Sequence, residues 1–474
     1  MTNRVLRALA FVGFGLACAA AGMPFAKCVP SFLVPDDGFF YAQIAFNLAH
    51  LHRSTFDGIH TTSGYHLPWG FVLAAVSAAV GLFSSAKAVH LFAYLATSFT
   101  LIGWTAHHFF RSWPGRIAAF VLLTTHFSLT EMALAAPLLL ALLRESSPEP
   151  RIRKNHVELA LAFALALVRV DLACVPIVLA ITHPERSRGL RLAAATVAGV
   201  LVQLAWMKLM FGQFFSVAAE LKTDGALRAI SWHIPYNLFP SVFVFLTYAA
   251  QVVMGALALK LRPTRATLRL VFASLSFLVF HVMLSIVRPW YMTPGWIMMA
   301  FVLERALEAA SRPERWRIAS NAVFWLVSIA FVVHSVRAEL FYREDQIAAA
   351  AAVEDLQRIV PPQTALFTFD NPGYLGFFSG LRVVDGDGLV NDYAYAKRLR
   401  AHTLAGYLDE ERICWVVTDF AGQHPQLSIG GLIVEASEMT LFTQHNRGHL
   451  ADFLLYRLKT ERCADSTTSV ELKP

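Results

Sequence analysis

Long apolar runs separated by short polar connections recur along the chain from residue 5 to about residue 336. A helix that spans a membrane needs about 20 apolar residues, because each helical residue rises about 1.5 Å. Several runs reach this length, so the pattern predicts a polytopic α-helical membrane protein. Beyond residue 338 no run is long enough to span, and charged residues and Gly/Asp turns become frequent.

Several connections between the apolar runs are rich in Arg and Lys, which is typical of the cytoplasmic side of a membrane. If all of them lie on that side, an even number of crossings separates each from the next, and the chain crosses about eleven times. The part after residue 338 then lies on the non-cytoplasmic side. The basic connections are residues 111–116, 144–154, 183–191, 260–269 and 311–317.

Two apolar segments near the start have alternative interpretations. Residues 5–26 could be a signal peptide, but an uncleaved first crossing is preferred because many spans follow. Residues 67–83 are apolar enough to cross, but a crossing there would put basic connections on opposite sides. We therefore expect residues 67–83 to lie in or dip into the outer leaflet.

Segments 116–143 and 157–181 must each leave and return to the same side within a short length. Each arm is then about 20 Å long, less than the ~30 Å hydrocarbon thickness, so each turn should lie below the outer surface. Non-helical backbone at that depth is tolerated only around a protein-lined or wet cavity. The first turn carries Glu131, and the second carries Arg169 and Asp171. Alternatively, each segment is one tilted span, which would put 144–154 outside.

The segment PDDGFFYAQIAFNLAH, residues 35–50, follows the first apolar run. It has Pro and Asp at its start and predicts a helix with an apolar face that can lie flat on the membrane. One Asp can cap such a helix through a backbone N–H, and a second Asp can be a solvated neighbour. Asp36 and Asp37 together are more than a cap requires, and their place beside the membrane favours a functional role.

With this topology, polar residues gather on the outer side. Carboxylates that face several cations suit a substrate with a phosphate at the depth of the lipid headgroups. These residues are Asp36, Asp37, Asp57, His60, His66, Glu131, Arg169, Asp171, Lys222, Asp224, Arg288, Trp290 and Tyr291.

Composition narrows the function classes. The chain is 56% hydrophobic and 15% charged, where a soluble protein carries about a quarter charged residues. The formal charge of +7 comes mostly from the connections, which argues against nucleic-acid binding. The Cys spacing fits no zinc or CxxC pattern. Cys414 and Cys463 could pair if the C-terminal part faces an oxidising compartment.

Residues 340–460 have the pattern of an α/β domain. Strands are expected at 364–370, 381–390 and 412–420, an amphipathic helix at 392–411, and a strand-to-turn connection at 370–376. No GxGxxG or GxxxxGK motif indicates a nucleotide site, and Asp385 and Asp387 suit a turn. We divide the chain into a membrane module, 1–338, whose first outer loop is 27–66, and a soluble α/β domain, 339–474, that covers the outer side of the module.

The first loop resembles that of the GT-C superfamily of membrane glycosyltransferases, which includes protein O-mannosyltransferases, aminoarabinose transferases of lipid A and related bacterial families. The resemblance continues in "LTEMAL", which corresponds to the family's "sGMEt", and in "LGFFSGLRVVDGDGLVND". The chain departs from the family pattern at Ser63, at "HLPW" and in the order of Glu131 and Met132. The first-loop matches are Asp36, Asp37, Phe40, Tyr41, Ile44, Ala45, Asn47, residues 55–58 and residues 64–66.

The resemblance implies an inverting glycosyltransferase of the bacterial inner membrane. It would move a sugar from a polyprenyl-phosphate donor to a hydroxyl of a lipid, glycan or protein on the outer side. Counting back from "YAQIA", Asp37 falls on the family's general base, and Asp36 and Glu131 are further catalytic candidates. A single base leads to inversion at the sugar C1.

The leaving phosphate needs cations, and a guanidinium binds phosphate by a two-toothed fork. Arg288 is the first choice, followed by Lys222 and Arg169, although Arg169 could instead pair with Asp171. Tyr291 could line the isoprenoid groove. His66 and Asp57 complete the expected substrate-binding set.

No cofactor is expected. Asp36, Asp37 and Glu131 could hold Mg²⁺ or Mn²⁺, but the absence of a His-rich or DxD motif in the membrane part disfavours a metal. The alternatives to an enzyme are a transporter or flippase of lipid-linked saccharide and a non-catalytic envelope assembly protein. A transporter would favour internal repeats, which the sequence does not show.

Overall fold

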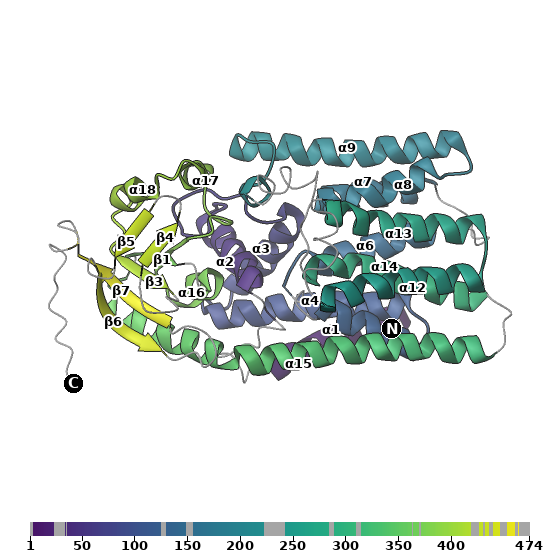
Figure 1. Cartoon of the computed structure of the whole chain (residues 1–474), viewed down its shortest axis with the longest axis horizontal. Helices are drawn as coiled ribbons and strands as arrows, with labels where there is room; N and C mark the ends of the chain where they lie inside the picture. Colours follow the sequence, from purple (N-terminus) through teal and green to yellow (C-terminus); the bar gives the residue numbers. More distant parts are fainter. Residues whose placement is uncertain are drawn as a thin grey trace.

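The computed structural model describes residues 3–22, 34, 36–124, 129–147, 155–221, 242–283, 289–309, 314–362, 364–368, 371–418, 426–429, 432–435, 439–445, 453–459 and 463. A helical bundle and a C-terminal α/β part follow one another along the long axis of the molecule (Figure 1).

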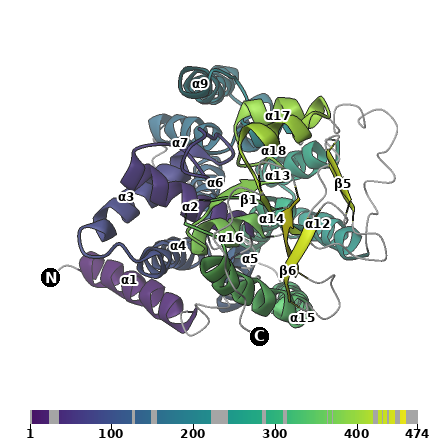
Figure 2. The same cartoon turned by 90° about the vertical axis from the view of Figure 1, so that its left-hand side faces the viewer.

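The bundle is built from helices that follow the apolar runs. Seen from the C-terminal end, α1 and α9 lie at its periphery (Figure 2). Its helices are α1 (Asn3–Gly22), α2 (Asp36–Leu51), α3 (Leu67–Gly81), α4 (Lys87–Phe109), α5 (Trp113–Thr124), α6 (Met132–Glu145), α7 (Asn155–Val168), the 3₁₀ turn η2 (Val170–Ala173), α8 (Cys174–Ile181), α9 (Arg186–Phe211), α12 (Val242–Leu261), α13 (Arg265–Met283), α14 (Pro289–Ala309) and α15 (Glu314–Ile359).

Among the described residues, three helices are long and apolar enough to cross a membrane: α4, α9 and the Glu314–Val333 part of α15. Side chains of α9 such as Leu201 and Leu209 are exposed, as lipid-facing residues are. Shorter apolar helices accompany these three, so the expected number of crossings stays a prediction. The shorter ones are Ala8–Ala20, Leu67–Gly81, Trp113–Thr124, His156–Val168, Val170–Ile181 and Tyr248–Leu261.

The described parts of all the basic connections meet at the end of the bundle away from the sheet. Each connection contacts the next one or a residue beside it, so the contacts form a ring. The basic connections thus lie at one end of the bundle, which is the arrangement that an even number of passes between them requires. The contacts are Arg111–Glu308, Arg144–His108, Arg188–Glu158, Arg269–Thr182 and Lys260 over the Trp316 ring.

Both short segments double back, as the sequence predicts. The start of α5 lies at the basic end, where the backbone N–H of Ser112 donates to Glu304 at 2.6 Å. The end of α6 returns there, because Ser146 donates to Glu158 at 2.7 Å. Helix α8 returns in the same way, since Arg269 donates to the Leu179 carbonyl. The alternative of two tilted spans is therefore wrong.

Helix α3 packs along α2 and does not run to the basic end. Its last residue, Gly81, lies against the His50 ring. A short turn later, Lys87 donates to the carbonyl of Phe377 in the C-terminal part at 2.6 Å. The chain is therefore on the sheet side again after residues 67–83. An even number of crossings between the basic connections requires this position. Whether α3 enters the outer leaflet stays a prediction.

The C-terminal part is an α/β fold. Its five-stranded sheet has the order β2-β1-β3-β7-β6, with β1 parallel to β2 and β3, and β7 antiparallel to β3 and β6. Cys414 and Cys463 form a disulfide. The elements are β1 (Ala365–Thr368), α16 (Pro372–Phe378), β2 (Arg382–Asp385), α17 (Tyr393–Arg400), α18 (Leu404–Glu410), β3 (Trp415–Thr418), the hairpin β4 (Gln426–Ile429) and β5 (Leu432–Glu435), β6 (Met439–His445) and β7 (Phe453–Leu458).

Two local predictions for this part are wrong. The single helix expected at 392–411 is broken into α17 and α18, because His402 has a φ of 56°, a left-handed conformation that ends helices. The connection after β1 is helical and forms α16.

The boundary predicted at residue 338 falls inside α15, which continues from the bundle to the sheet (Figure 1).

The first loop and α2 pack tightly on the C-terminal part. The Phe39 ring contacts the rings of Phe377 and Phe378 on α16. A Cβ on Gly64 would lie 1.9 Å from the carbonyl oxygen of Leu389 and 2.8 Å from the Cα of Val390. Only glycine therefore allows this close approach of two backbones.

The Gly64→Ala substitution tests this contact. We expect it to destabilise the protein by about 1–3 kcal/mol, because both opposing groups are backbone and must move. Thermal unfolding in detergent measures the loss. Gly13→Ala is the matched control, since no heavy atom lies within 4 Å of a Cβ there. Equal melting temperatures for the two variants would contradict the prediction.

Candidate active site

The N-terminal turns of α2 place Asp37 and Tyr41 on one face of the helix, because residues four apart are neighbours on a helix surface. Asp37 is partly exposed in the first turn, where the positive end of the helix dipole favours a carboxylate. Tyr41 is buried. Asp37 therefore lies one helical turn before Tyr41 on the same face of α2.

The Tyr41 hydroxyl contacts Glu131 and His66, which come from segments distant in the sequence. It donates to Oε2 of Glu131 at 2.7 Å and lies 2.6 Å from Nδ1 of His66. Nδ1 of His66 is also 3.3 Å from Oε2 of Glu131. Glu131 precedes α6 at the first hairpin turn, and His66 precedes α3. The expected residues Glu131 and His66 are thus brought together beside the Asp37 face of α2.

The second hairpin turn completes this group through Arg169. Its Nη1 donates to Oε1 of Glu131 at 2.8 Å. Its Nε donates to Oδ1 of Asp171 at 3.0 Å, and its Nη2 pairs with Oδ2 of the same residue. Asp171 also lies 3.2 Å from Nε2 of His281 on α13. One guanidinium therefore connects the turns of both hairpins.

The side chain of Arg169 is only 4% exposed, and two carboxylates compensate its charge. A guanidinium in this position has little capacity left for a substrate phosphate. The expectation that Arg169 binds phosphate directly is therefore disfavoured, and the alternative of pairing with Asp171 is confirmed.

Asp36 has a different neighbour from Asp37. Its carboxylate accepts from the backbone N–H groups of Gly373 and Tyr374 at 3.1 and 2.9 Å. It thus caps the first turn of α16. This geometry assigns Asp36 to the junction with the C-terminal part and disfavours a direct catalytic role.

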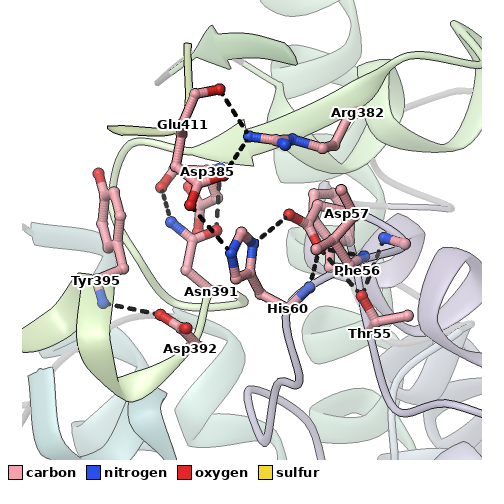
Figure 3. Close-up of polar contacts among 12 residues, drawn as sticks. Thr55, Phe56, Asp57, His60, Arg382, Asp385, Asn391, Asp392, Tyr395 and Glu411 are labelled. Atoms are coloured by element: carbon pink, nitrogen blue, oxygen red, sulfur yellow. Dashed lines mark hydrogen bonds and ion pairs between the residues drawn. The ribbon is translucent and has the colours of Figure 1, made fainter. Parts of the chain in front are cut away.

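Asp57 also lies at this junction (Figure 3). Its Oδ2 is 2.7 Å from Nδ1 of His60, whose Nε2 is 3.3 Å from Glu411. Burial alone would raise the pKa of Asp57, but hydrogen bonds from His60 and from nearby backbone N–H groups lower it. The hydrogen bond to Asp57 raises the pKa of His60, against the effect of its partial burial. Asp57 therefore holds the first loop to the C-terminal part.

The predicted turn at Asp385 is confirmed. Its carboxylate accepts from the backbone N–H groups of Asp387 and Val390, and Asn391 bonds its backbone. Complete burial, with the nearby Asp387 charge, raises the pKa of Asp385 to about 8. The carboxyl group thus orders the loop that meets Gly64.

Several expected site residues cannot be placed. Lys222 and Arg288 lie outside the described residues. Tyr291 belongs to α14, but its side chain is outside the described set. The described residues contain no group of three His, Cys, Asp or Glu side chains that could hold a metal ion. The expectation of no cofactor stays a prediction.

Sequence reasoning missed two members of the site. Tyr41 matches the first-loop pattern, but its hydroxyl gives no separate signal in the sequence. His281 lies inside the apolar run of α13, and an ionisable residue in such a run is itself a signal of function.

A cavity of about 690 Å³ lies at the basic end of the bundle, lined by residues that include Arg111, Glu304, Trp316 and Arg317. It is remote from Glu131 and Asp37, so it is not part of the candidate site.

Comparison with known proteins places the fold. No family model and no curated protein matches the sequence. ArnT from Cupriavidus metallidurans, solved bound to undecaprenyl phosphate, matches with a TM-score of 0.54 and 14% identity over 96% of this chain and 99% of ArnT. The Archaeoglobus fulgidus oligosaccharyltransferase, solved with zinc and sulfate, matches with a TM-score of 0.43 and 10% identity over 85% of this chain and 68% of that one, too distant to support a conclusion.

The match to ArnT extends over almost the whole of both chains and shows that this chain has the GT-C fold. The fold predicted from the first-loop motifs is therefore confirmed.

The Arg169→Gln substitution tests the contact between the hairpins. It leaves the buried carboxylate of Glu131 and the partly buried carboxylate of Asp171 without this cation, so we expect a loss of about 3–5 kcal/mol in stability. Adding Asp171→Asn should restore part of the loss, which a double-mutant cycle of melting temperatures measures. Arg191→Gln is the control, because its pair with Glu185 is half exposed and contributes little. Equal losses for Arg169→Gln and Arg191→Gln would refute the assignment.

The Asp57–His60 contact predicts a pH dependence of the first loop. The folded pKa of His60 is raised above its ordinary 6.5, so its contribution is complete below 6.5 and is lost as pH rises through the folded value. Asp57 has a lowered pKa, so its contribution is present above its ordinary 3.8 and is lost on acidification below that.

Hydrogen exchange of residues 55–62, corrected for intrinsic rates, should therefore show most protection in mildly acidic buffer and less at alkaline pH. The variant His60→Asn should lose this dependence. His52→Asn, at an exposed histidine, should keep it. An unchanged profile in His60→Asn would exclude the mechanism.

Proposed function

We propose that the chain is an inverting glycosyltransferase that moves a sugar from a polyprenyl-phosphate donor to a hydroxyl acceptor at the non-cytoplasmic face of a bacterial inner membrane. One observation carries the proposal. The Asp37 face of α2 lies beside Tyr41, His66 and Glu131 at the hairpin turns, in a chain with the GT-C fold. That ArnT was solved bound to undecaprenyl phosphate supports the donor class.

Asp37 acts as the general base. Attack of the acceptor oxygen on the sugar C1 requires loss of the hydroxyl proton as the C–O bond forms, and a carboxylate within about 3 Å can accept it. The polyprenyl phosphate departs from the opposite face with the electron pair of the C1–O bond. With one base and no covalent intermediate, the configuration at C1 inverts.

The leaving phosphate requires preorganised cations, which are most effective in a dry site. Arg288 and Lys222 are assigned this role in the proposal, because the guanidinium of Arg169 is already paired with Glu131 and Asp171. Arg169 instead fixes Glu131, and through it the Tyr41 hydroxyl. Tyr291 is assigned to the isoprenoid groove.

We assign the orientation of the protein in the membrane from the residues at the two ends of the molecule. The ring of basic connections favours the cytoplasm at one end. The Cys414–Cys463 disulfide at the other end is typical of an oxidising compartment such as the periplasm. In this orientation α2, the hairpin turns and the α/β part lie on the outer side, where the acceptor would be a lipid, a glycan or a protein.

The pair Asp37→Asn and Asp36→Asn tests the proposal. Asp37→Asn should lower transfer by about 10²–10⁴-fold, because the base is lost, and should retain lipid binding. Asp36→Asn keeps one of the two oxygens that accept from Gly373 and Tyr374 and removes no group assigned to the chemistry, so most of the activity should remain. Purified protein in nanodiscs is assayed with a panel of polyprenyl-phosphate sugars and hydroxyl acceptors. Full activity in Asp37→Asn removes Asp37 as the base, and lipid translocation without transfer favours a flippase.

A further inference from the structure

His66 is held in one orientation by buried partners. Its Nδ1 lies 2.6 Å from the Tyr41 hydroxyl, and its ring is stacked on the Tyr41 ring with 14° between the planes. Tyr41 and Glu131 are buried, whereas 39% of the His66 side chain is exposed. Within the part of the chain that the structure describes, no hydrogen bond engages Nε2 of His66. The imidazole is thus fixed through one nitrogen and open at the other.

The hydrogen bonds around Tyr41 determine which nitrogen of His66 carries the proton. A tyrosine hydroxyl has one proton, and Tyr41 donates it to Oε2 of Glu131 at 2.7 Å. Glu131 is an ionised acceptor, because its other oxygen accepts from Arg169 at 2.8 Å. The Tyr41 oxygen must therefore accept from the Nδ1–H of His66. In a neutral imidazole this leaves a lone pair on Nε2.

An imidazole that donates from Nδ1 toward a buried carboxylate and presents Nε2 to an open site has the arrangement of a general base. Here the carboxylate of Glu131 acts directly at 3.3 Å and through the Tyr41 hydroxyl. Its negative charge would stabilise the imidazolium formed when Nε2 accepts a proton. A series of hydrogen bonds thus runs from Arg169 through Glu131 and Tyr41 to His66. It orients the imidazole and places a negative charge near it, so that Nε2 can accept a proton.

Asp37 lies on the same face of α2 as Tyr41, one helical turn earlier and about 6 Å away along the axis. A bridging water or substrate hydroxyl would connect its carboxylate to Nε2 of His66. We infer that Nε2 of His66 takes over the proton that Asp37 removes from the acceptor hydroxyl. This inference rests on the proposed function and adds a second proton-transfer residue to it.

The step balances. The acceptor O–H bond breaks as the new C1–O bond forms, and the polyprenyl phosphate leaves with the electron pair of the old C1–O bond. The proton passes from Asp37 to Nε2 of His66, which restores the Asp37 carboxylate, and the imidazolium then releases it to water. The charged and titratable groups that contact His66 are Tyr41 from α2 and Glu131 from the first hairpin turn; Arg169 from the second turn contacts Glu131, and Asp37 lies one helical turn before Tyr41.

The test is the pH profile of kcat for the full-length protein in nanodiscs, with the donor that the wild type uses. The wild type should show an acid limb, a fall in kcat on acidification, because a protonated Nε2 cannot take the proton from Asp37. His66→Gln should lower kcat by about tenfold or more and abolish this limb, with little change in KM. Tyr41→Phe should keep the limb but shift it and lower kcat, because the hydroxyl that fixes Nδ1 is lost.

His50→Gln is the matched control, since the His50 ring bonds only the Phe46 carbonyl of its own helix among its described hydrogen bonds. It should leave the profile unchanged. Should His66→Gln not fold, the shift of the limb in Tyr41→Phe decides the question. A wild-type profile retained in a folded His66→Gln, or in Tyr41→Phe, overturns this inference and leaves the proposed function standing. A wild type without any transfer overturns both.

Discussion

The buried guanidinium of Arg169 is the contact on which the candidate site depends. A charge removed from water is costly unless it is paired and hydrogen-bonded, and Arg169 meets both conditions through Glu131 and Asp171. Those carboxylates belong to the turns of different hairpins. The pairing therefore fixes two stretches of non-helical backbone against each other, which is how such backbone is tolerated in an apolar bundle. A purely apolar contact would not specify this register.

Further contacts connect Glu131, and through it Arg169, to α2. The second oxygen of Glu131 holds the Tyr41 hydroxyl, which in turn orients His66. Successive residues of a helix point about 100° apart, so Asp36 and Asp37 cannot serve one site in the same way. Asp36 caps α16 in the C-terminal part, and Asp37 shares the Tyr41 face. Asp36 thus anchors the α/β part, and Asp37 is the carboxylate to which the proposed function gives the chemistry.

The features that depend on the local sequence pattern could be predicted. Clustered Arg and Lys residues indicated that the basic connections share one end, and the short apolar segments indicated hairpins whose turns carry Glu131 and Arg169. What depended on partners far away in sequence was missed or misassigned. The partner of Asp36 is the backbone of Gly373, the role of the Tyr41 hydroxyl depends on Glu131, and the broken helix at 392–411 depends on the backbone of His402. The roles of Lys222 and Arg288 rest on chemical reasoning alone.

The distribution of charge along the molecule also bears on the side of the membrane from which substrates would reach the candidate site. In the proposed orientation the basic ring stays on the cytoplasmic side, because connections rich in Arg and Lys resist transfer across a bilayer. The opposite end carries the disulfide, the buried Asp385 turn and the Gly64 contact, all of which fit a folded domain in contact with an oxidising aqueous phase. A donor whose phosphate stays at headgroup depth would then meet Asp37 between the membrane and the α/β part. In the proposed mechanism, exclusion of water from that space once the donor is bound would strengthen the cations against the leaving phosphate.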